Sequence, residues 1–302
     1  MIITRKYLYL VALAREKHFG RAATACHVSP STLSAAIHDI ETELGVAVVE
    51  RGQQFAGITQ EGRCIVEYVQ RMAETAEGLR QELCQMRDGL TGRLSMGVIP
   101  TALTVVASLS AAFSRRHPGV HIEILSLSTV EILERLQNFQ LDAGIIYTES
   151  ALESQLITIP LWRERHVLLH SVGMTEFEGR SSVTWFEATR VPLCLLTEDM
   201  QNRKTIDAVF ANLGCKAQPT LETNSIVSML AHVCSGAWSA ILPRSVLDLM
   251  GVPAGVQVLP LVEPAVSWET GLVVANREPR IPMIDALMDE ARGLKDLFAK
   301  YE

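Results

Sequence analysis

The clearest alternation of apolar and polar positions in the chain lies between residues 60 and 88. Apolar side chains recur there at spacings of four and three residues, with charged residues between them. This is the a/d repeat of a coiled coil over about three heptads, and a helix with a single apolar stripe needs a partner. The stripe consists of Ile65, Val69, Met72, Ala76, Leu79, Leu83 and Met86. The partner is either the rest of the same domain or the same helix of a second subunit.

Three shorter helical patterns precede this segment, within residues 4–44. Apolar residues follow helical spacing over 7–14, small residues dominate 20–26, and a third pattern runs from Pro30 to Leu44. Ser29 is a good N-cap, Pro30 suits the first helical position, and Gly45 supplies a C-terminal stop. Two helices joined by a short turn, the second with a polar outer face, predict a helix-turn-helix.

The polar face of the third helix offers groups that DNA can use. Hydroxyls donate to phosphates or accept from base edges, and a threonine methyl can contact thymine. Residues 46–59 predict a two-stranded wing, in which Arg51 is the expected phosphate contact. The predicted DNA contacts are Arg21, Ser29, Pro30, Ser31, Thr32, Ser34, His38 and Arg51. From these residues alone, a three-helix bundle without a DNA role is the alternative.

From residue 93 onward, strand and helix patterns alternate. We expect strands at 93–99, 120–127, 141–147, 166–171, 192–196, 219–223, 237–242 and 269–276. Helices are expected at 101–115, 129–139, 201–213, 225–234 and 282–300. Alternation of this kind predicts α/β layers with mainly parallel sheets.

A ligand site can be predicted from this pattern. Ligands of open α/β sheets bind beyond the carboxyl ends of the strands, where helix N-termini favour an anion. The expected effector is therefore a small anion or carboxylate. The candidate contacts are Pro100, Thr101, Ser128, Thr129, Thr197, Asn202, Arg203 and Asn224. For Ser128 a capping box with Glu131 is an alternative role that needs no ligand.

Charge supports DNA binding only weakly. The net charge of the whole chain is −7, but six Lys/Arg against five Asp/Glu give residues 1–58 a net charge of +1. Residues 91–302 carry 17 Lys/Arg against 23 Asp/Glu, a net charge of −6. The asymmetry has the sign that a DNA-binding N-terminal domain requires, yet DNA binding has to be argued from the motif.

Other classes of protein find little support in the sequence. The apolar run that follows Arg5 and Lys6 ends at Arg15 and has helical spacing, so we interpret it as a helix and expect a cytoplasmic protein without a membrane span. The six cysteines include no CxxC pair. No G-x-S-x-G, HExxH, Walker A or G-x-G-x-x-G pattern is present. We therefore predict no catalytic residue, no metal ligand and no cofactor, with an enzyme of unidentified type as a remote alternative.

The N-terminal residues resemble the LysR-type transcriptional regulators. The matching positions are His18-Phe19-Gly20-Arg21-Ala22-Ala23, His27-Val28-Ser29, Leu33-Ser34, Ile37, Glu41, Glu43-Leu44-Gly45-Val46, Glu50-Arg51 and Thr59-Gln60-Glu61-Gly62. The chain departs from the family at Pro30-Ser31, where Gln-Pro is usual, and at Ala35 and Ala36, where a cation or Gln is usual. Gln53, Gln54 and Phe55 stand where a second wing cation is common. These departures imply an unusual base preference and a lower affinity for phosphates.

The resemblance also implies a domain organisation and partners. It implies a winged helix-turn-helix at 1–59, a dimerisation helix at 60–88 and an effector-binding domain at 91–302. The last domain would resemble a periplasmic binding protein, with subdomain I at 91–161 and 268–302 and subdomain II at 162–267. A homotetramer on a pseudo-palindromic site in double-stranded DNA, in contact with RNA polymerase, is implied. Weaker matches that carry this resemblance are Leu136, Leu141-Asp142, Pro160-Leu161, Gly236 and Leu242-Pro243.

Two further points concern the implied effector domain. Peroxide-sensing members of the family carry a cysteine pair in the region that here spans Asn202 to Leu213, where this chain has Asn202, Ala211 and no cysteine. A thiol-based redox regulator is thus the alternative within the family. Trp238 stands where a second glycine commonly follows Gly236, so its ring should either narrow the effector cleft or pack at an interface.

Overall fold

The computed structural model describes residues 4–50, 55–151, 155–277 and 279–298. The chain forms two compact units, Met1–Arg87 and Asp88–Glu302, and each is described by itself. None of the helices over the described residues combines the length and the apolarity that crossing a bilayer requires.

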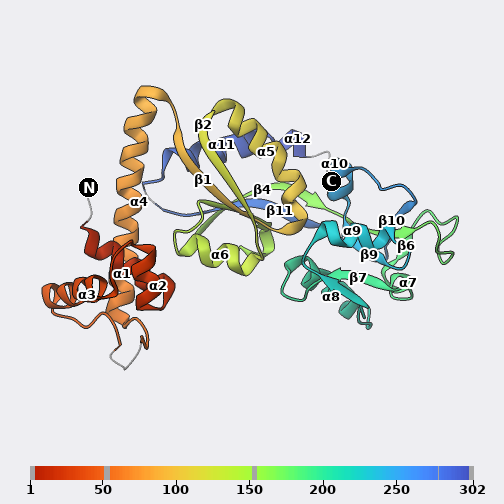
Figure 1. Ribbon diagram of the computed structural model, residues 1–302. Helices are drawn as coiled ribbons and strands as arrows, with labels where there is room; N and C mark the ends of the chain where they lie inside the picture. Colours follow the sequence, from red (N-terminus) through yellow and green to blue (C-terminus); the bar gives the residue numbers. More distant parts are fainter. Residues whose placement is uncertain (1–3, 51–54, 152–154, 278, 299–302) are drawn as a thin grey trace. The chain divides into compact units, whose positions relative to one another are not determined.

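The N-terminal unit contains the three short helices and the long one that the sequence predicts (Figure 1). These are α1 (Arg5–Glu16), α2 (Phe19–Ala25), α3 (Pro30–Leu44) and α4 (Gln60–Asp88). The Ser29 side chain accepts from the backbone N–H of Thr32, and Gly45 ends α3 in the left-handed region with φ 68°. The helices enclose one small core, to which the first turns of α4 contribute. Its buried members are Leu10, Ala12, Leu13, Ala22, Ala23, Leu33, Ile37, Ile40 and Val48.

The predicted two-stranded wing is reduced to one bridge in the described residues. Val49 pairs with Ile58 as an isolated antiparallel bridge, and Arg51 lies outside the residues that the structure describes. The Glu41 carboxylate on α3 accepts hydrogen bonds from the backbone N–H groups of Val48 and Val49. The Glu41 side chain therefore holds the first residues of the wing against α3.

Gly62 allows the first turn of α4 to lie against the segment after α3. A Cβ at this position would lie 2.7 Å from Cγ2 of Ile58 and still closer to the Val48 carbonyl oxygen. Thr59 fixes the approach, because its hydroxyl donates to the Ala47 carbonyl and accepts from the Gly62 N–H. The close contact therefore requires a residue without a side chain.

We expect Gly62→Ala to lower the free energy of unfolding of the N-terminal unit by about 2 kcal/mol, the usual cost of overpacking. Far-UV circular dichroism during denaturation measures this loss. All four tryptophans lie at or after residue 162, so their fluorescence, which reports the second unit, should not change. Gly293→Ala is the matched control, since nothing lies within 4 Å of the added methyl. Equal stability of Gly62→Ala and wild type would contradict the packing described.

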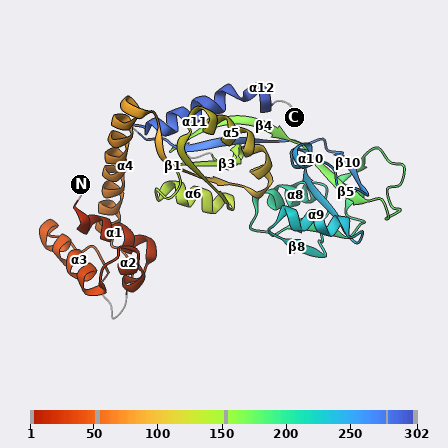
Figure 2. The ribbon, with the colours of Figure 1, turned by 45° about the horizontal axis from the view of Figure 1, so that its top comes forward.

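The second unit begins with a five-stranded sheet in the order β2-β1-β3-β11-β4. Its strands are β1 (Thr91–Val98), β2 (Gly119–Ser126), β3 (Ala143–Tyr147), β4 (Leu156–Glu164) and β11 (Trp268–Ala275). Strand β1 pairs in parallel with β2 and β3, whereas β11 is antiparallel to β3 and β4. Helices α5 (Leu103–Arg116) and α11 (Pro282–Gly293) cover one face and α6 (Thr129–Gln137) the other (Figures 1 and 2).

A six-stranded sheet follows in the order β6-β10-β5-β9-β7-β8. Its strands are β5 (His166–Ser171), β6 (Val183–Thr184), β7 (Leu193–Leu196), β8 (Leu221–Thr223), β9 (Ser239–Pro243) and β10 (Val256–Val262). Alternate residues of β5 enter different cores, because strand side chains alternate between faces. Leu168 packs with α7 (Trp185–Ala188) and α8 (Gln201–Asn212), whereas Val167 and Leu169 pack with α9 (Ile226–Cys234) and α10 (Arg244–Met250).

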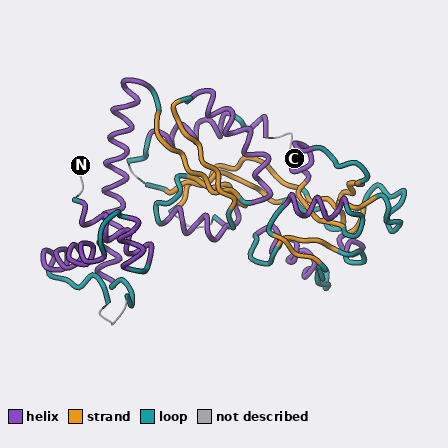
Figure 3. Tube along the Cα trace, viewed as in Figure 1, coloured by secondary structure: helices purple, strands orange, loops and turns teal. Residues whose placement is uncertain are grey.

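The chain passes between the two sheets twice, from β4 to β5 at Arg165 and from β10 to β11 over residues 263–267. Figure 3 shows the two groups of strands joined by these connections. The expectation of mainly parallel sheets holds for β2-β1-β3, β8-β7-β9 and the pair β10-β6, whereas β11 with β3 and β4, and β5 with β9 and β10, pair antiparallel. The sequence analysis did not predict β4, β6, β10, α7 and α10, and the predicted last helix is divided into α11 and α12 (Lys295–Phe298).

Candidate DNA interface and effector site

The candidate DNA interface is the outer face of α3. Ser31, Thr32, Ser34 and His38 are all exposed, while Leu33, Ile37 and Ile40 on the other side are buried. The Ser29 hydroxyl lies 2.8 Å from the hydroxyls of both Ser31 and Thr32, beside the exposed Pro30 at the first position of the helix. These hydroxyls form a polar surface that can contact phosphates and base edges.

Arg21 on α2 supplies a cation to the same unit. Its side chain is 64% exposed, and one guanidinium nitrogen donates to the Glu16 carbonyl at 2.6 Å. The Glu16 carboxylate lies 3.9 Å from Nε of Arg21, which is too far for a hydrogen bond. The Arg21 side chain is therefore accessible to a phosphate.

The apolar stripe on α4 divides into two parts. Ile65 packs against the core of the N-terminal unit and Val69 is 5% exposed. Met72, Leu79 and Leu83 are 57%, 48% and 55% exposed, and Ala76 is half-buried. The side chain of Met86 lies outside the described residues. The outer part of the stripe is thus not covered by the chain's own described residues.

The predicted effector contacts follow adjacent strands of the first sheet. Thr101 comes after β1, Thr129 after β2, and Tyr147 ends β3, so the three residues lie at the same edge of parallel strands. All three side chains are at least 95% buried. Pro100 is also buried, whereas Ser128 caps α6 in a capping box with Glu131, as the alternative role predicted.

A buried hydrogen-bond network joins this edge to the second sheet. The Tyr147 hydroxyl donates to the Glu164 carboxylate at 2.8 Å, and the Asn202 amide donates to the Tyr147 oxygen at 3.2 Å. The same amide nitrogen lies 2.7 Å from Nε2 of His166. Asn202 on α8 thereby connects β3 of the first sheet with β5 of the second.

Glu164 is held in this network by neutral donors. Besides Tyr147, it accepts from the indole N–H of Trp162 at 3.0 Å and from the Ser245 hydroxyl at 3.5 Å. Among the described residues, no lysine or arginine forms an ion pair or hydrogen bond with Glu164. Burial consequently raises the pKa of Glu164 from 4.5 to about 7.

The other two titratable groups of the network are neutral at physiological pH. Burial lowers the pKa of His166 from 6.5 to about 3, so that its Nε2 is free to accept from the Asn202 amide and its proton resides on Nδ1. Burial, and then repulsion by Glu164, raises the pKa of Tyr147 well above its ordinary value. Only Glu164 can change charge near neutral pH.

The sequence analysis missed Tyr147, Trp162, Glu164, His166 and Ser245. A signal for three of them was present in Trp162-Arg163-Glu164-Arg165-His166, where alternate residues share one face of an extended segment. The first, third and fifth residues are buried, and both arginines are exposed. An inward-facing glutamate next to a tryptophan indicates a buried polar site.

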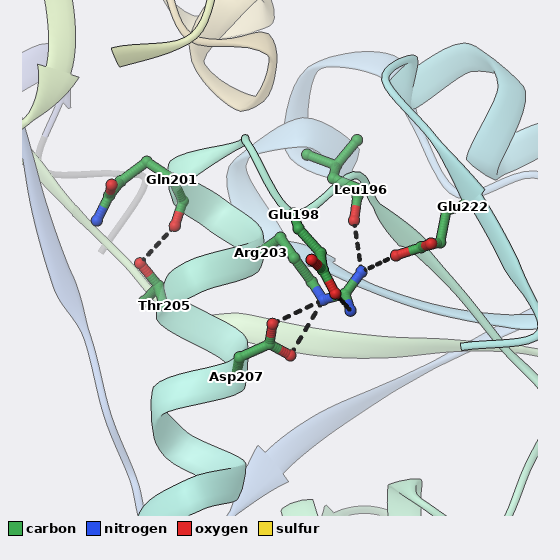
Figure 4. A network of polar contacts seen from close by, with 7 residues as sticks. All are labelled: Leu196, Glu198, Gln201, Arg203, Thr205, Asp207 and Glu222. Atoms are coloured by element: carbon green, nitrogen blue, oxygen red, sulfur yellow. Dashed lines mark hydrogen bonds and ion pairs between the residues drawn. The ribbon is translucent and has the colours of Figure 1, made fainter. Parts of the chain in front are cut away.

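Arg203, by contrast, is not available to a ligand (Figure 4). Its guanidinium is 2% exposed, binds the Asp207 carboxylate through Nε at 2.9 and 3.0 Å, and donates to the Leu196 carbonyl at 2.9 Å. It also pairs with Glu222, and the Glu198 carboxylate lies 3.7 Å away. We therefore leave Arg203 out of the proposed effector site.

The remaining predicted contacts lie outside the buried network. The Thr197 side chain is half-buried, its backbone N–H donating to the Thr223 carbonyl, and Asn224 is exposed. The indole N–H of Trp238 donates to the Thr220 hydroxyl at 3.1 Å, and its ring packs edge-to-face against His232 on α9. Trp238 thus packs within the second sheet's own layer.

Cys194 does not have the environment of a reactive thiol. It is fully buried, and burial raises its pKa to about 11. Reactive cysteines have lowered pKa values. The Cys215 thiol donates to the Phe210 carbonyl at 3.4 Å.

Comparison with known proteins agrees with this architecture. Residues 4–63 match the family model "Bacterial regulatory helix-turn-helix protein, lysR family", and residues 87–295 match "LysR substrate binding domain". A hydrogen peroxide-inducible genes activator of Haemophilus influenzae is 27% identical over 308 residues, covering 95% of this chain and 97% of the relative.

Solved structures are similar along nearly the whole chain. The full-length OxyR C199D structure from Pseudomonas aeruginosa has a TM-score of 0.73 and 29% identity, covering 96% of this chain and 95% of its own. The structure of full-length CbnR complexed with target DNA has a TM-score of 0.62 at 19% identity, covering 96% of this chain and 98% of its own, and shows the shared fold. With both family models matched and the helix-turn-helix and α/β unit in place, the chain belongs to the LysR family of helix-turn-helix transcriptional regulators.

Proposed function

We propose that this regulator binds pseudo-palindromic double-stranded DNA as a dimer or dimer of dimers, and that a small effector bound at the junction of its two sheets alters this binding. The observation that carries the proposal is the exposed polar face of α3, opposite a buried apolar face in a helix-turn-helix unit. The proposed contacts are those of α3 and Arg21, with Arg51 of the undescribed segment 51–54 as a further phosphate contact. Contact with RNA polymerase belongs to the same proposal.

The exposed part of the α4 stripe supports pairing of two chains. Met72, Leu79 and Leu83 follow a/d spacing and are each about half exposed, whereas a helix that packed only on its own domain would bury them. Two copies of the stripe can cover each other in a coiled coil. A dimer then places two α3 helices on one DNA molecule, which explains a preference for two half-sites separated by whole helical turns.

We expect the double variant Leu79→Glu, Leu83→Glu to weaken dimerisation at least about 100-fold, because two charged groups per chain would be desolvated at the interface. Analytical ultracentrifugation measures the dissociation constant. Binding to a two-half-site DNA duplex should weaken, while binding to a single half-site should stay the same. Thr75→Glu is the matched control, since Thr75 is exposed on α4 outside the stripe. A double variant that dimerises like wild type would show that α4 does not pair the chains.

The similarity to hydrogen peroxide-inducible activators raises peroxide sensing through a thiol as a second candidate function. The sequence argues against that mechanism, because Asn202 and Ala211 occupy the region where peroxide-sensing members carry their cysteine pair. The buried Cys194 has a raised pKa and is a poor substitute. We therefore favour reversible binding of an effector over oxidation of a cysteine.

A further inference from the structure

The junction of the two sheets contains several buried polar groups that lack a protein partner. Oδ1 of Asn202, Nδ1 of His166 and the hydroxyls of Thr129 and Thr270 make no hydrogen bond within the described chain. All four residues are at least 95% buried. Thr270 lies directly opposite Tyr147 in the antiparallel pair of β11 and β3. Buried polar groups are normally paired, so the unpartnered atoms of Asn202 and Thr270, which both adjoin Tyr147, indicate a place where a ligand completes the network.

The unpartnered groups have a definite hydrogen-bonding character. Both hydrogens of the Asn202 amide are used, by Tyr147 and His166, so that only its oxygen remains and can only accept. The two threonine hydroxyls can donate and accept, and Nδ1 of His166 can only donate. This set is suited to a ligand with N–H or O–H donors and at least one acceptor. None of its members carries a charge.

The charges near this set disfavour an anion. The Glu164 carboxylate accepts a hydrogen bond from Tyr147 and has no cationic partner among the described residues. The N-terminus of α6 is already capped by the Glu131 carboxylate, whose pKa is lowered by hydrogen bonds from Ser128. Arg203, the one buried arginine nearby, is already paired with carboxylates.

A cationic ligand does not fit the network either. Both Glu164 oxygens already accept hydrogen bonds from neutral donors, and the Tyr147 hydroxyl stands between Glu164 and Asn202. An ammonium group bound at Asn202 would lose its hydration, and the Tyr147 hydroxyl would separate it from the Glu164 carboxylate. Such a loss is costly for a charged group.

We propose that the group of Thr129, Asn202, His166 and Thr270 binds an uncharged ligand with N–H or O–H donors, such as a primary amide or an alcohol, and that Glu164 excludes carboxylates. This inference rests on the proposed function, because it places the effector at the same junction. It replaces the anion that the helix N-termini alone led us to expect. Glu164 is then a specificity-determining residue that acts on the ligand through Tyr147.

The test uses thermal unfolding of the full-length protein, followed by tryptophan fluorescence, at about pH 8.5 so that Glu164 is ionised. The probes are two matched sets of similar shape and different charge: acetamide, acetate and ethylammonium, and benzamide, benzoate and benzylammonium. We expect at least one amide to raise Tm, and its apparent affinity to fall at least about tenfold in Asn202→Ala and in Thr129→Val. Asn212→Ala, the same change at the exposed end of α8, is the matched control and should bind like wild type.

Glu164→Gln examines the source of the selectivity. We expect it to raise the apparent affinity for benzoate relative to benzamide at least about tenfold, because the buried negative charge is removed. The inference is overturned if a carboxylate or an ammonium binds wild type more tightly than its amide, or if none of the six probes raises Tm. The Asn202 and Thr129 variants decide the matter even if Glu164→Gln does not fold. A gel shift of the same protein with its own upstream DNA separates the two proposals: DNA binding without any probe response overturns this inference alone, whereas absence of DNA binding overturns the proposed function.

Discussion

Arg203→Met is expected to lower the free energy of unfolding of the second unit by about 2 kcal/mol, because the Leu196 carbonyl loses its donor and the partly exposed Asp207 and Glu222 carboxylates lose their cation. Methionine fills the volume of the side chain stem but none of its hydrogen bonds. Asp207 and Glu222 would then face each other without a cation, and the Leu196 carbonyl would lose its donor. Figure 4 shows how these groups converge on the guanidinium from α8, β7 and β8.

Denaturant unfolding followed by tryptophan fluorescence measures this loss, since every tryptophan belongs to the second unit. Glu198→Gln is the matched control. The Glu198 side chain is 78% exposed and its carboxylate lies 3.7 Å from the guanidinium, so the free energy of unfolding should change by no more than about 0.5 kcal/mol. Arg203→Lys should recover only part of the stability, because an ammonium group cannot bind Asp207, Glu222 and Leu196 in one plane. If Arg203→Met were as stable as Glu198→Gln, the network would have no structural role.

Arg203 also shows which part of the candidate site the sequence could not predict. Its position after a strand, at the start of a helix, predicted an anion ligand from local pattern alone. The carboxylates that occupy it come from residues four and nineteen positions further along the chain, and Glu222 reaches it only because β8 pairs with β7. Tertiary pairing of this kind is not visible in a local motif.

The N-terminal unit was the most predictable part, for a physical reason. Its helices are set by local signals, and α3 begins and ends at the residues that the Ser29 cap and the Gly45 stop indicate. The wing was less predictable, because its short strands pair through a single bridge, Val49 with Ile58, in the described residues. In the second unit, the missed strands β4 and β10 each contain a proline, Pro160 and Pro260, which weakens the strand signal in the sequence.

The proposed effector site also contains residues that were predictable from the sequence and residues that were not. Thr101, Thr129 and Asn202 were predicted because strand ends and helix starts can be located from periodicity, and all three are buried at the junction of the sheets. The residues that set the charge of the site, Glu164 and His166, lie in the crossing between the sheets. Their role depends on burial from both sides, which the sequence alone does not give.

Replacing Glu164 or His166 is expected to change how the stability of the second unit depends on pH. The folded pKa of Glu164 is raised from 4.5 to about 7, and that of His166 is lowered from 6.5 to about 3, in both cases by burial. Between pH 4.5 and 6.5, folding therefore takes up a proton at Glu164 and releases one at His166. The two changes cancel, so in wild type this pair contributes almost no slope to the free energy of unfolding in that window.

When either residue is replaced, the titration of the other should make the free energy of unfolding depend on pH. In Glu164→Gln the unfolded state binds one more proton than the folded state, at His166, so stability should fall by about 1.4 kcal/mol per pH unit as the pH is lowered from 6.5 to 4.5, or about 3 kcal/mol in all. In His166→Gln the folded state alone holds the extra proton, on Glu164, and stability should instead fall by a similar amount per unit as the pH rises from 4.5 towards 7.

The comparison is made between each variant and wild type at every pH, because all other titrating groups then cancel. Tryptophan fluorescence in urea gives the free energy of unfolding of the second unit. The ionic strength is kept constant with added salt, so that the screening of charges does not change with pH. Opposite slopes in the two variants can arise only if the carboxyl is buried with its proton and the imidazole without one. Parallel profiles for both variants and wild type would mean that Glu164 and His166 are solvated, and the buried network behind the proposed ligand selectivity would not exist.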